Sequence, residues 1–395
     1  MKSVTIVGIG MGADTVTAEG LRAVERAQAL LGAPRMLGAF AHAGRPVYPV
    51  YAPDAVCKVI EGSGLERFVV LVSGDTGFFS AAEGLAAALA ACDVRLIPGV
   101  SSIAYFFARL RQPWQQAALV SCHGRSANFV DVVRRNRLTF ALTGGQVDAL
   151  ARSLADAGLG GLAATVGENL GAADERIFTL RADELAQTPA RKLAVLLVDN
   201  PDADARVRCG IPDEEFMRGD APMTKAEVRA VSMSRLALRP DAVCCDIGAG
   251  TGSVTVEMAL AAHAGHVYAV EQQQEALALV EGNCRRFHIG NVTRVAGRAP
   301  EALSDLPPLD AAFVGGSGGA MAGIFDAILL KNPRARIVVN AIALETLNAA
   351  LAAFAAHGIA PEVMQLGAAR AKRAGDLHMM TALNPVFILS GGGRP

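Results

Sequence analysis

Residues 242–257 read AVCCDIGAGTGSVTVE. The apolar run that ends in Asp246 is typical of a buried strand, and the residues from Ser253 onward favour a helix. The turn between them contains Gly248, Gly250 and Gly252. Glycines let the backbone turn sharply and let a ligand approach the N–H groups at a helix N-terminus. The stretch therefore predicts a strand, a cofactor loop and a helix, as in a Rossmann-like doubly wound α/β domain.

The residues around this loop favour S-adenosylmethionine over a dinucleotide. The dinucleotide pattern requires Gly or Ala five residues after its first glycine, and this chain has Ser253 there. Asp246 is placed to reach the ammonium group of the cofactor. The next predicted strand ends in Glu271, where an acid can pair with both ribose hydroxyls. The turn after the third strand contains Arg298 and Ala299, at the expected place for an adenine-contacting loop.

The same alternation of strands and helices extends through most of the 395 residues and predicts an α/β protein with largely parallel sheets. A polar stretch rich in helix breakers, between Asn200 and Pro222, predicts a linker. We therefore expect two domains, residues 1–205 and 206–395. The predicted strands are Val4–Val7, Phe68–Val72, Val94–Ile97, Leu119–Cys122, Thr139–Leu142, Leu193–Val198, Ala242–Asp246, Val267–Val270, Val292–Val295, Ala311–Val314 and Ile337–Val339.

Composition excludes several classes of protein. With 52% hydrophobic and 19% charged residues the chain can bury large cores, and its net charge of −1 provides no field that would attract nucleic acid. None of the seven cysteines forms a C-x-x-C pair, so no metal site is expected. The N-terminus lacks a signal-peptide pattern, and no apolar stretch reaches the length of a membrane span. We expect a cytoplasmic protein with no membrane or nucleic-acid partner.

Four blocks in the second half, at residues 222–229, 246–253, 313–319 and 339–346, resemble the decarboxylating precorrin methyltransferase domain of cobalamin biosynthesis. The resemblance implies methylation of precorrin-6B at carbon 15 with loss of the acetate carboxyl on ring C. It also implies that Thr224 and Gly316 lie near cofactor and substrate. Asn340 and Glu345 are candidate catalytic residues. Alternatively, these two residues only cap the next helix, and residues 315–319 form a simple turn.

The first half resembles the tetrapyrrole methylase family, in its carbon-5 precorrin branch, over roughly residues 3–200. The blocks that carry the resemblance are the glycine-rich loop at residues 8–13 and residues 72–79, 97–102 and 121–125. It implies a two-lobed fold with the cofactor folded in the cleft between the lobes. The implied cofactor contacts are Gly74, Asp75, Phe78, Gly99, Ser101 and Ser102. Met11 and Thr76 depart from the family, which often has proline there, and Asp75 has an alternative role as a turn residue.

Substrate contacts are predicted from side-chain chemistry. His123 is a candidate catalytic residue, with a structural hydrogen-bonding role as the alternative. Arg125 is a candidate contact for a substrate carboxylate, because its guanidinium matches a carboxylate bidentately. Two basic clusters either line substrate clefts or are solvated surfaces. They are Arg134, Arg135 and Arg137, and Arg370, Lys372 and Arg373.

Taken together, the halves resemble the fused precorrin-6B C-5,15-methyltransferases (decarboxylating). The resemblance implies methylation of precorrin-6B at C-5 and C-15 with decarboxylation, giving precorrin-8, and it implies one S-adenosylmethionine site per domain and a homo-oligomer. Alternatives are a methyltransferase acting on another small molecule, on RNA or on protein, a nicotinamide dehydrogenase, and a non-enzymatic adenosylmethionine-binding regulator.

Overall fold

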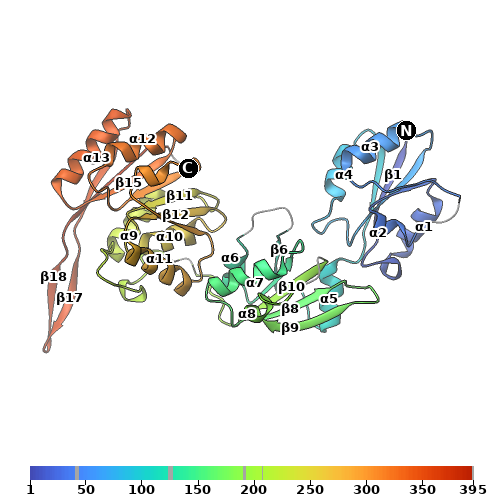
Figure 1. The fold of residues 1–395 in the computed structure, drawn as a ribbon, viewed down its shortest axis with the longest axis horizontal. Coiled ribbons are helices and arrows are strands. Elements are labelled where there is room, and N and C mark those ends of the chain that lie inside the picture. Colours follow the sequence, from blue (N-terminus) through green and yellow to red (C-terminus); the bar gives the residue numbers. More distant parts are fainter. Residues whose placement is uncertain (41–43, 123–127, 190–192, 207, 394–395) are drawn as a thin grey trace. The chain divides into compact units, whose positions relative to one another are not determined.

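The computed structural model describes residues 1–40, 44–122, 128–189, 193–206 and 208–393 (Figure 1). The structure divides into two compact units, and each unit combines segments from separate parts of the sequence. The first unit contains residues 1–125, 137–150 and 162–201, and the second contains residues 126–136, 151–161 and 202–395. Two contacts show why the short segments group with the second unit. Asn128 Nδ2 donates a 2.8 Å hydrogen bond to the His263 carbonyl, and His288 Nδ1 lies 2.9 Å from the Ala157 carbonyl oxygen.

The first unit begins with a five-stranded parallel sheet, ordered β3-β2-β4-β1-β5. Its strands are β1 (Ser3–Gly8), β2 (Ala29–Leu31), β3 (Val47–Tyr48), β4 (Arg67–Val72) and β5 (Asp93–Ile97), and its helices are η1 (Ala13–Thr15), α1 (Ala18–Arg26), α2 (Pro34–Leu37), α3 (Pro53–Gly62) and α4 (Ala82–Ala88). Because side chains alternate along a strand, Val4 and Ile6 face one buried core while Val7 faces the other. All five strands end at one edge, where the connecting loops meet.

The second sheet of this unit is mixed, so the prediction of largely parallel sheets is wrong for it. The order is β6-β7-β10-β8-β9, and only β6 and β7 are parallel. Only residues 169–175 connect β8 to β9, and a parallel crossover needs a dozen or more residues. The elements along this part of the chain are α5 (Ser102–Leu110), β6 (Ala117–Ser121), α6 (Phe129–Arg135), β7 (Leu138–Leu142), α7 (Val147–Asp156), β8 (Ala163–Glu168), β9 (Arg176–Arg181), α8 (Ala182–Leu185) and β10 (Ala194–Asp199). Of these, α6 and the second half of α7 belong to the second unit.

The second unit contains a seven-stranded sheet with helices on both faces, ordered β13-β12-β11-β14-β15-β19-β16. Its strands are β11 (Val243–Ile247), β12 (His266–Glu271), β13 (Val292–Ala296), β14 (Ala311–Val314), β15 (Arg336–Ala341), β16 (Glu362–Leu366) and β19 (Val386–Gly391). The helices are η2 (Asp213–Glu215), α9 (Ala226–Leu236), α10 (Ser253–Ala261), α11 (Gln274–Arg286), η3 (Glu301–Leu303), α12 (Met321–Lys331) and α13 (Leu344–Ala356). The first five strands in this order are parallel, whereas β19 is antiparallel to β15 and to β16.

Two adjacent cysteines in the interior strand β11 show how both faces of this sheet are covered. Cys244 and Cys245 are both fully buried, and they belong to cores on opposite faces. Burial raises the pKa of the Cys244 thiol to about 12 and the pKa of Cys245 well above its usual value. Both thiols therefore act as small apolar side chains.

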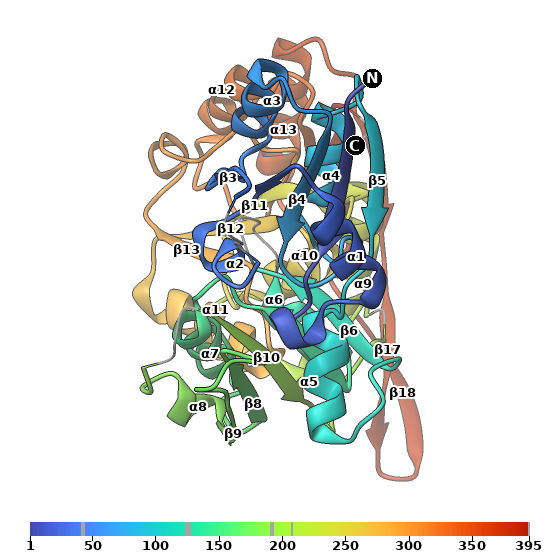
Figure 2. The same ribbon diagram turned by 90° about the vertical axis from the view of Figure 1, so that its right-hand side faces the viewer.

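A hairpin of β17 (Ala369–Ala374) and β18 (Leu377–Ala382) extends away from the rest of the second unit (Figures 1 and 2). Both strands are exposed along their whole length. At the base of the hairpin, Arg370 binds Asp213 in η2 and Glu227 in the first turn of α9, and so attaches the hairpin to these two helices. Across the described ranges, no helix is long and apolar enough to cross a membrane.

Candidate functional site

The glycine-rich loop of the second unit connects β11 to α10. Gly248, Gly250 and Gly252 have φ of 73°, 55° and 77°, a conformation that favours glycine. At Gly250 a Cβ would lie 2.6 Å from the carbonyl oxygen of Pro222, and at Gly248 one would lie 2.9 Å from the Gly316 nitrogen. The loop is therefore packed between two other loops and has room only for glycine.

Asp246 lies beneath this loop and is 1% exposed. Its Oδ2 accepts a 2.5 Å hydrogen bond from Thr255 Oγ1. Its Oδ1 and the hydroxyl of Thr251 are buried and have no partner in the described part of the chain. Burial raises the pKa of Asp246 to about 7, while the hydrogen bond from Thr255 opposes this shift. Buried polar atoms without partners are costly, so this pair of atoms is suited to receive polar groups of a ligand.

Glu271, at the end of β12, holds the glycine-rich loop from the other side. Its Oε2 accepts a 3.0 Å hydrogen bond from the Gly250 N–H, and its Oε1 accepts bonds from the backbone of Gln272 and Gln273. These residues border a cavity of about 240 Å³. Of the predicted cofactor contacts, those that line it are Gly248, Gly250, Glu271, Arg298, Ala299 and Gly316.

The remaining predicted residues of this half lie outside the cavity lining. Asp246 and Gly252 support the loop from below, and a Cβ at Gly252 would approach the Val280 Cα to 3.0 Å. The carbonyl of Thr224 accepts a 2.5 Å hydrogen bond from the fully buried Arg229. Thr224 lies two residues after Pro222, whose carbonyl oxygen packs against Gly250 of the glycine-rich loop.

The two candidate catalytic residues after β15 differ in environment. Asn340 Oδ1 lies 3.1 Å from the Ser232 hydroxyl, and its Nδ2 is buried without a partner among the described residues. Glu345 is exposed in the first turn of α13. The alternative that Asn340 caps this helix is wrong, because the N-cap is Ala343 and no side chain caps it. Neither residue lines the 240 Å³ cavity.

In the first unit, three loops meet where β1, β4 and β5 end. The backbones of Gly10 and Gly74 exchange two hydrogen bonds of 3.1 and 2.9 Å. A Cβ at Gly8 would lie 2.7 Å from the Gly74 oxygen and 2.8 Å from the Gly99 nitrogen. The glycines that the sequence places in these loops therefore allow three backbones to approach one another.

Asp75 joins two of these loops through its carboxylate. Oδ1 accepts a 2.8 Å hydrogen bond from the Gly77 N–H, and Oδ2 accepts a 3.1 Å bond from the Gly99 N–H. Ser101 is the N-cap of α5 and accepts a hydrogen bond from the Ala104 N–H. Both side chains thus hold backbone, which is the turn role given as the alternative for Asp75.

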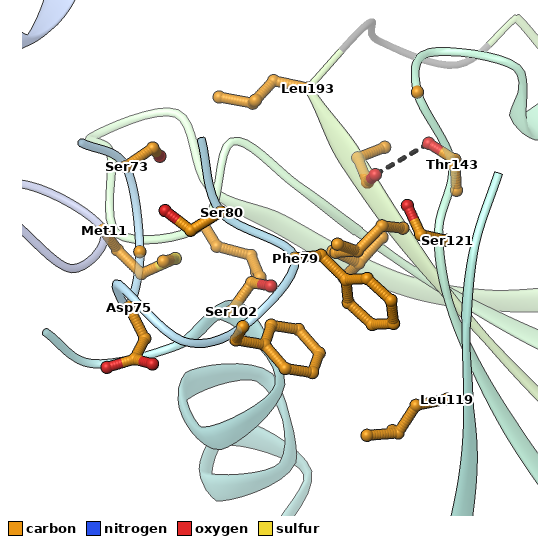
Figure 3. Close-up of a pocket in the computed structure, with 18 of the residues that line it drawn as sticks. Met11, Ser73, Asp75, Phe79, Ser80, Ser102, Leu119, Ser121, Thr143 and Leu193 are labelled. Atoms are coloured by element: carbon orange, nitrogen blue, oxygen red, sulfur yellow. Dashed lines mark hydrogen bonds between the residues drawn. The ribbon is translucent and has the colours of Figure 1, made fainter. Parts of the chain in front are cut away.

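A cavity of about 1110 Å³ lies beside these loops within the first unit (Figure 3). Gly74, Asp75, Phe78 and Ser102 line it, whereas Gly99 and Ser101 support the lining from behind. Its opposite wall comes from the second sheet, where Thr143 Oγ1 donates to the Ala194 carbonyl. The candidates His123 and Arg125 lie outside the described residues.

Comparisons with known proteins cover both halves. Residues 3–186 match the model for Tetrapyrrole (Corrin/Porphyrin) Methylases, and residues 215–391 match the model for the Precorrin methyltransferase domain. A precorrin-6Y C(5,15)-methyltransferase [decarboxylating] from a Sinorhizobium species is 36% identical over 288 residues, which are 69% of this chain and 68% of that protein. The chain belongs to the decarboxylating precorrin methyltransferase family. It is therefore an S-adenosylmethionine-dependent methyltransferase.

Two further relatives match the second half. A probable cobalt-precorrin-6B C(15)-methyltransferase (decarboxylating) from Pyrobaculum calidifontis is 46% identical over 184 residues, 46% of this chain and 94% of that protein. The crystal structure of a precorrin-6Y C5,15-methyltransferase from Geobacter metallireducens has 39% identity and a TM-score of 0.45, covering 47% of this chain and 96% of that chain.

The basic clusters expected at substrate clefts are mostly engaged by protein carboxylates. Arg134 and Arg135 pair with Asp131, and Arg137 pairs with Asp199. In the second cluster Arg370 pairs with two acids, and Arg373 lies 4.0 Å from Asp376. These arginines are therefore already paired with protein carboxylates and are less available to a substrate.

Sequence reasoning missed several residues that line the larger cavity. They are Arg35, Phe79, Leu119, Thr143 and Leu193. Phe79, Leu119 and Leu193 are large apolar side chains with 47%, 40% and 52% of their surface exposed. Arg35 follows β2, a strand of only three residues that gives too weak a pattern to predict. A search for cations after each strand end of the first sheet would have found it.

Proposed function

We propose that this chain methylates one precorrin substrate at two carbons, C-5 in the first half and C-15 in the second, and removes the ring C acetate carboxyl as carbon dioxide in the second half. The proposal keeps the predicted division into residues 1–205 and 206–395. It is carried by the presence of two separate cavities, each beside glycine-rich loops at the ends of parallel strands. The names of the relatives, which combine C(5,15) methylation with decarboxylation, support it.

The residues of the second unit fit S-adenosylmethionine. Asp246 Oδ1 and Thr251 Oγ1 are polar atoms without partners, and the glycine-rich loop has no room for a Cβ. In the proposal Asp246 attracts the ammonium group, and Glu271 binds the ribose hydroxyls. Arg298 and Ala299 border the adenine. The bound cofactor supplies a methyl group on a positively charged sulfur.

In the first unit the 1110 Å³ cavity has room for both a cofactor and a flat macrocycle. We assign the cofactor to the side formed by Gly74, Asp75 and Ser102. The exposed apolar side chains of Phe79, Leu119 and Leu193 suit the apolar face of a tetrapyrrole. The task of these residues is to hold the substrate carbon in line with the methyl donor, because orientation alone can supply roughly 7–11 kcal/mol.

Decarboxylation needs an electron sink, and a protonated ring imine of the substrate serves as one in this scheme. When the carbon–carboxyl bond breaks, its electron pair passes into the macrocycle and a proton is later added. Asn340, with its unpartnered buried amide, is the candidate residue for orienting substrate in the second half. The cytoplasmic location and the homo-oligomer stay predictions from sequence.

The test uses the full chain, precorrin-6B and S-adenosylmethionine with a carbon-13 methyl group. Two labelled methyl resonances, at C-5 and C-15, and one carbon dioxide per substrate are expected. Labelling at one carbon only, or methylation without loss of carbon dioxide, contradicts the division of labour. Labelling of RNA but not of precorrin contradicts the proposed substrate.

A further inference from the structure

Arg35 lines the larger cavity from the short helix α2. It is the second residue of α2, whose first residue is Pro34 and whose last, Leu37, is 4% exposed in the core. Because β2 pairs with β4 in parallel, the turn after β2 lies beside the loop that begins at Ser73. The arginine lines the same cavity as that loop.

Arg35 differs in charge from the other described residues that line the cavity. Among the described residues that line the cavity, Arg35 is the one cation, and Asp75 and Glu83 are the acids. The carboxylate of Asp75 is engaged by two backbone N–H groups. Arg35 is exposed. In the described part of the chain, it makes no ion pair or side-chain hydrogen bond.

Other arginines of the same unit are paired with acids and do not line the cavity. Arg109 binds Glu175 at 2.7 Å, and Arg95 binds Glu19 at 2.5 Å. A guanidinium that faces a large cavity and is not neutralised by protein carboxylates remains available to an anionic group of a ligand. Its planar fork matches a carboxylate bidentately.

We infer that Arg35 binds one peripheral carboxylate of the tetrapyrrole substrate and thereby determines the rotation of the macrocycle over the methyl donor. This inference rests on the proposed function of the first half. The apolar side chains of Phe79, Leu119 and Leu193 offer contact to the ring system but no preference among its edges. Glu83 on the same cavity repels carboxylates, so the single cation selects which edge of the ring faces α2.

The experiment compares the full-length wild type with Arg35→Ala and Arg35→Lys, using precorrin-6B and carbon-13 methyl donor. Loss of a charge-assisted pair predicts a KM for precorrin at C-5 that is about 10- to 100-fold higher in Arg35→Ala. Arg35→Lys keeps the charge without the fork and is expected to fall between the two. The KM for S-adenosylmethionine and the methylation of C-15 are expected to stay within twofold of wild type.

Arg22→Ala is the matched control, because Arg22 is an exposed arginine of α1 that does not line the cavity. An unchanged KM for precorrin in Arg35→Ala overturns the inference and leaves the proposed function standing. An equal rise in the KM for S-adenosylmethionine also overturns it, because Arg35 would then act on the cofactor or the fold. Absence of C-5 methylation in the wild type overturns the proposed function itself.

Discussion

Thr255 Oγ1 donates a 2.5 Å hydrogen bond to one oxygen of Asp246, and the other oxygen of this carboxylate is buried without a partner among the described residues. Asp246 is the next-to-last residue of the interior strand β11, and Thr255 lies in the first turn of α10. Thr255 thus binds one oxygen of the carboxylate, and the other oxygen lies buried beneath the glycine-rich loop without a hydrogen-bond partner among the described residues. Burial, partly offset by the bond from Thr255, raises the pKa of Asp246 to about 7.

The raised pKa predicts that cofactor binding in the second unit depends on pH. The protonated acid cannot attract an ammonium group, so affinity for S-adenosylhomocysteine is expected to rise about tenfold between pH 6 and pH 8, as Asp246 ionises. Asp246→Asn is expected to weaken binding and remove this dependence. Calorimetric titration of the full chain at three pH values measures it.

Asp241→Asn is the control, since Asp241 is an exposed acid paired with Arg239 and its pKa is lowered rather than raised. It is expected to keep the wild-type profile. A pH profile that is the same in Asp246→Asn as in the wild type would show that another group is responsible.

Gly250→Ala tests the room in the glycine-rich loop. The new Cβ would lie 2.6 Å from the Pro222 oxygen at a φ of 55°, so the loop must move. We expect loss of C-15 methylation with C-5 methylation retained, measured by the carbon-13 assay. Gly358→Ala is the matched control, because Gly358 has a φ of 66° but nothing within 4 Å of an added Cβ. It is expected to cost about 1–2 kcal/mol of stability and to leave both activities intact.

Arg229→Ala tests the buried ion pair behind the same loop. Arg229 and Glu257 are 0% and 1% exposed and lie 2.6 Å apart, and Arg229 also reaches Asp213 at 3.5 Å. Removing the guanidinium leaves the buried Glu257 without its cation, whereas Asp213 keeps its pair with Arg370. The unfolding free energy of the second unit is therefore expected to fall by about 3–5 kcal/mol. Urea unfolding measures this change. Arg239→Ala, which removes an exposed arginine, is expected to change little, and equal effects of the two substitutions would contradict the prediction.

Asp75→Asn tests the loop junction of the first unit. An amide can accept a hydrogen bond from only one of the N–H groups of Gly77 and Gly99 and places its own N–H₂ against the other. The C-5 methylation rate is expected to fall about 10- to 100-fold, while C-15 methylation is retained in the carbon-13 assay. Asp54→Asn, on the exposed start of α3, is the control. A similar loss at both carbons would instead indicate unfolding of the chain.

The cofactor loop of the second unit was predictable from sequence because its determinants are local. A buried strand, three glycines with positive φ and an acid at each of two strand ends are all visible within thirty residues of Asp246. The structure places Glu271 at the end of β12, as predicted, and there it accepts a hydrogen bond from the Gly250 N–H. The mixed sheet of the first unit was not predicted. The direction of a strand can be inferred from the length of the connection to its neighbour only when both strands are known, and β8 and β9 were not predicted.

Local patterns also determined which residues of the first unit lie in its loops, but not what their side chains bind. Asp75 accepts from a glycine 24 residues further on, which no spacing rule predicts. Arg134 and Arg137 look like substrate cations in sequence and are neutralised by Asp131 and Asp199. Arg35 belongs to no sequence motif, and in the structure it is the one cation among the described residues that line the cavity. Backbone conformation depends on neighbours in the chain, whereas the partner of a charge depends on which distant strands the packed sheet brings together.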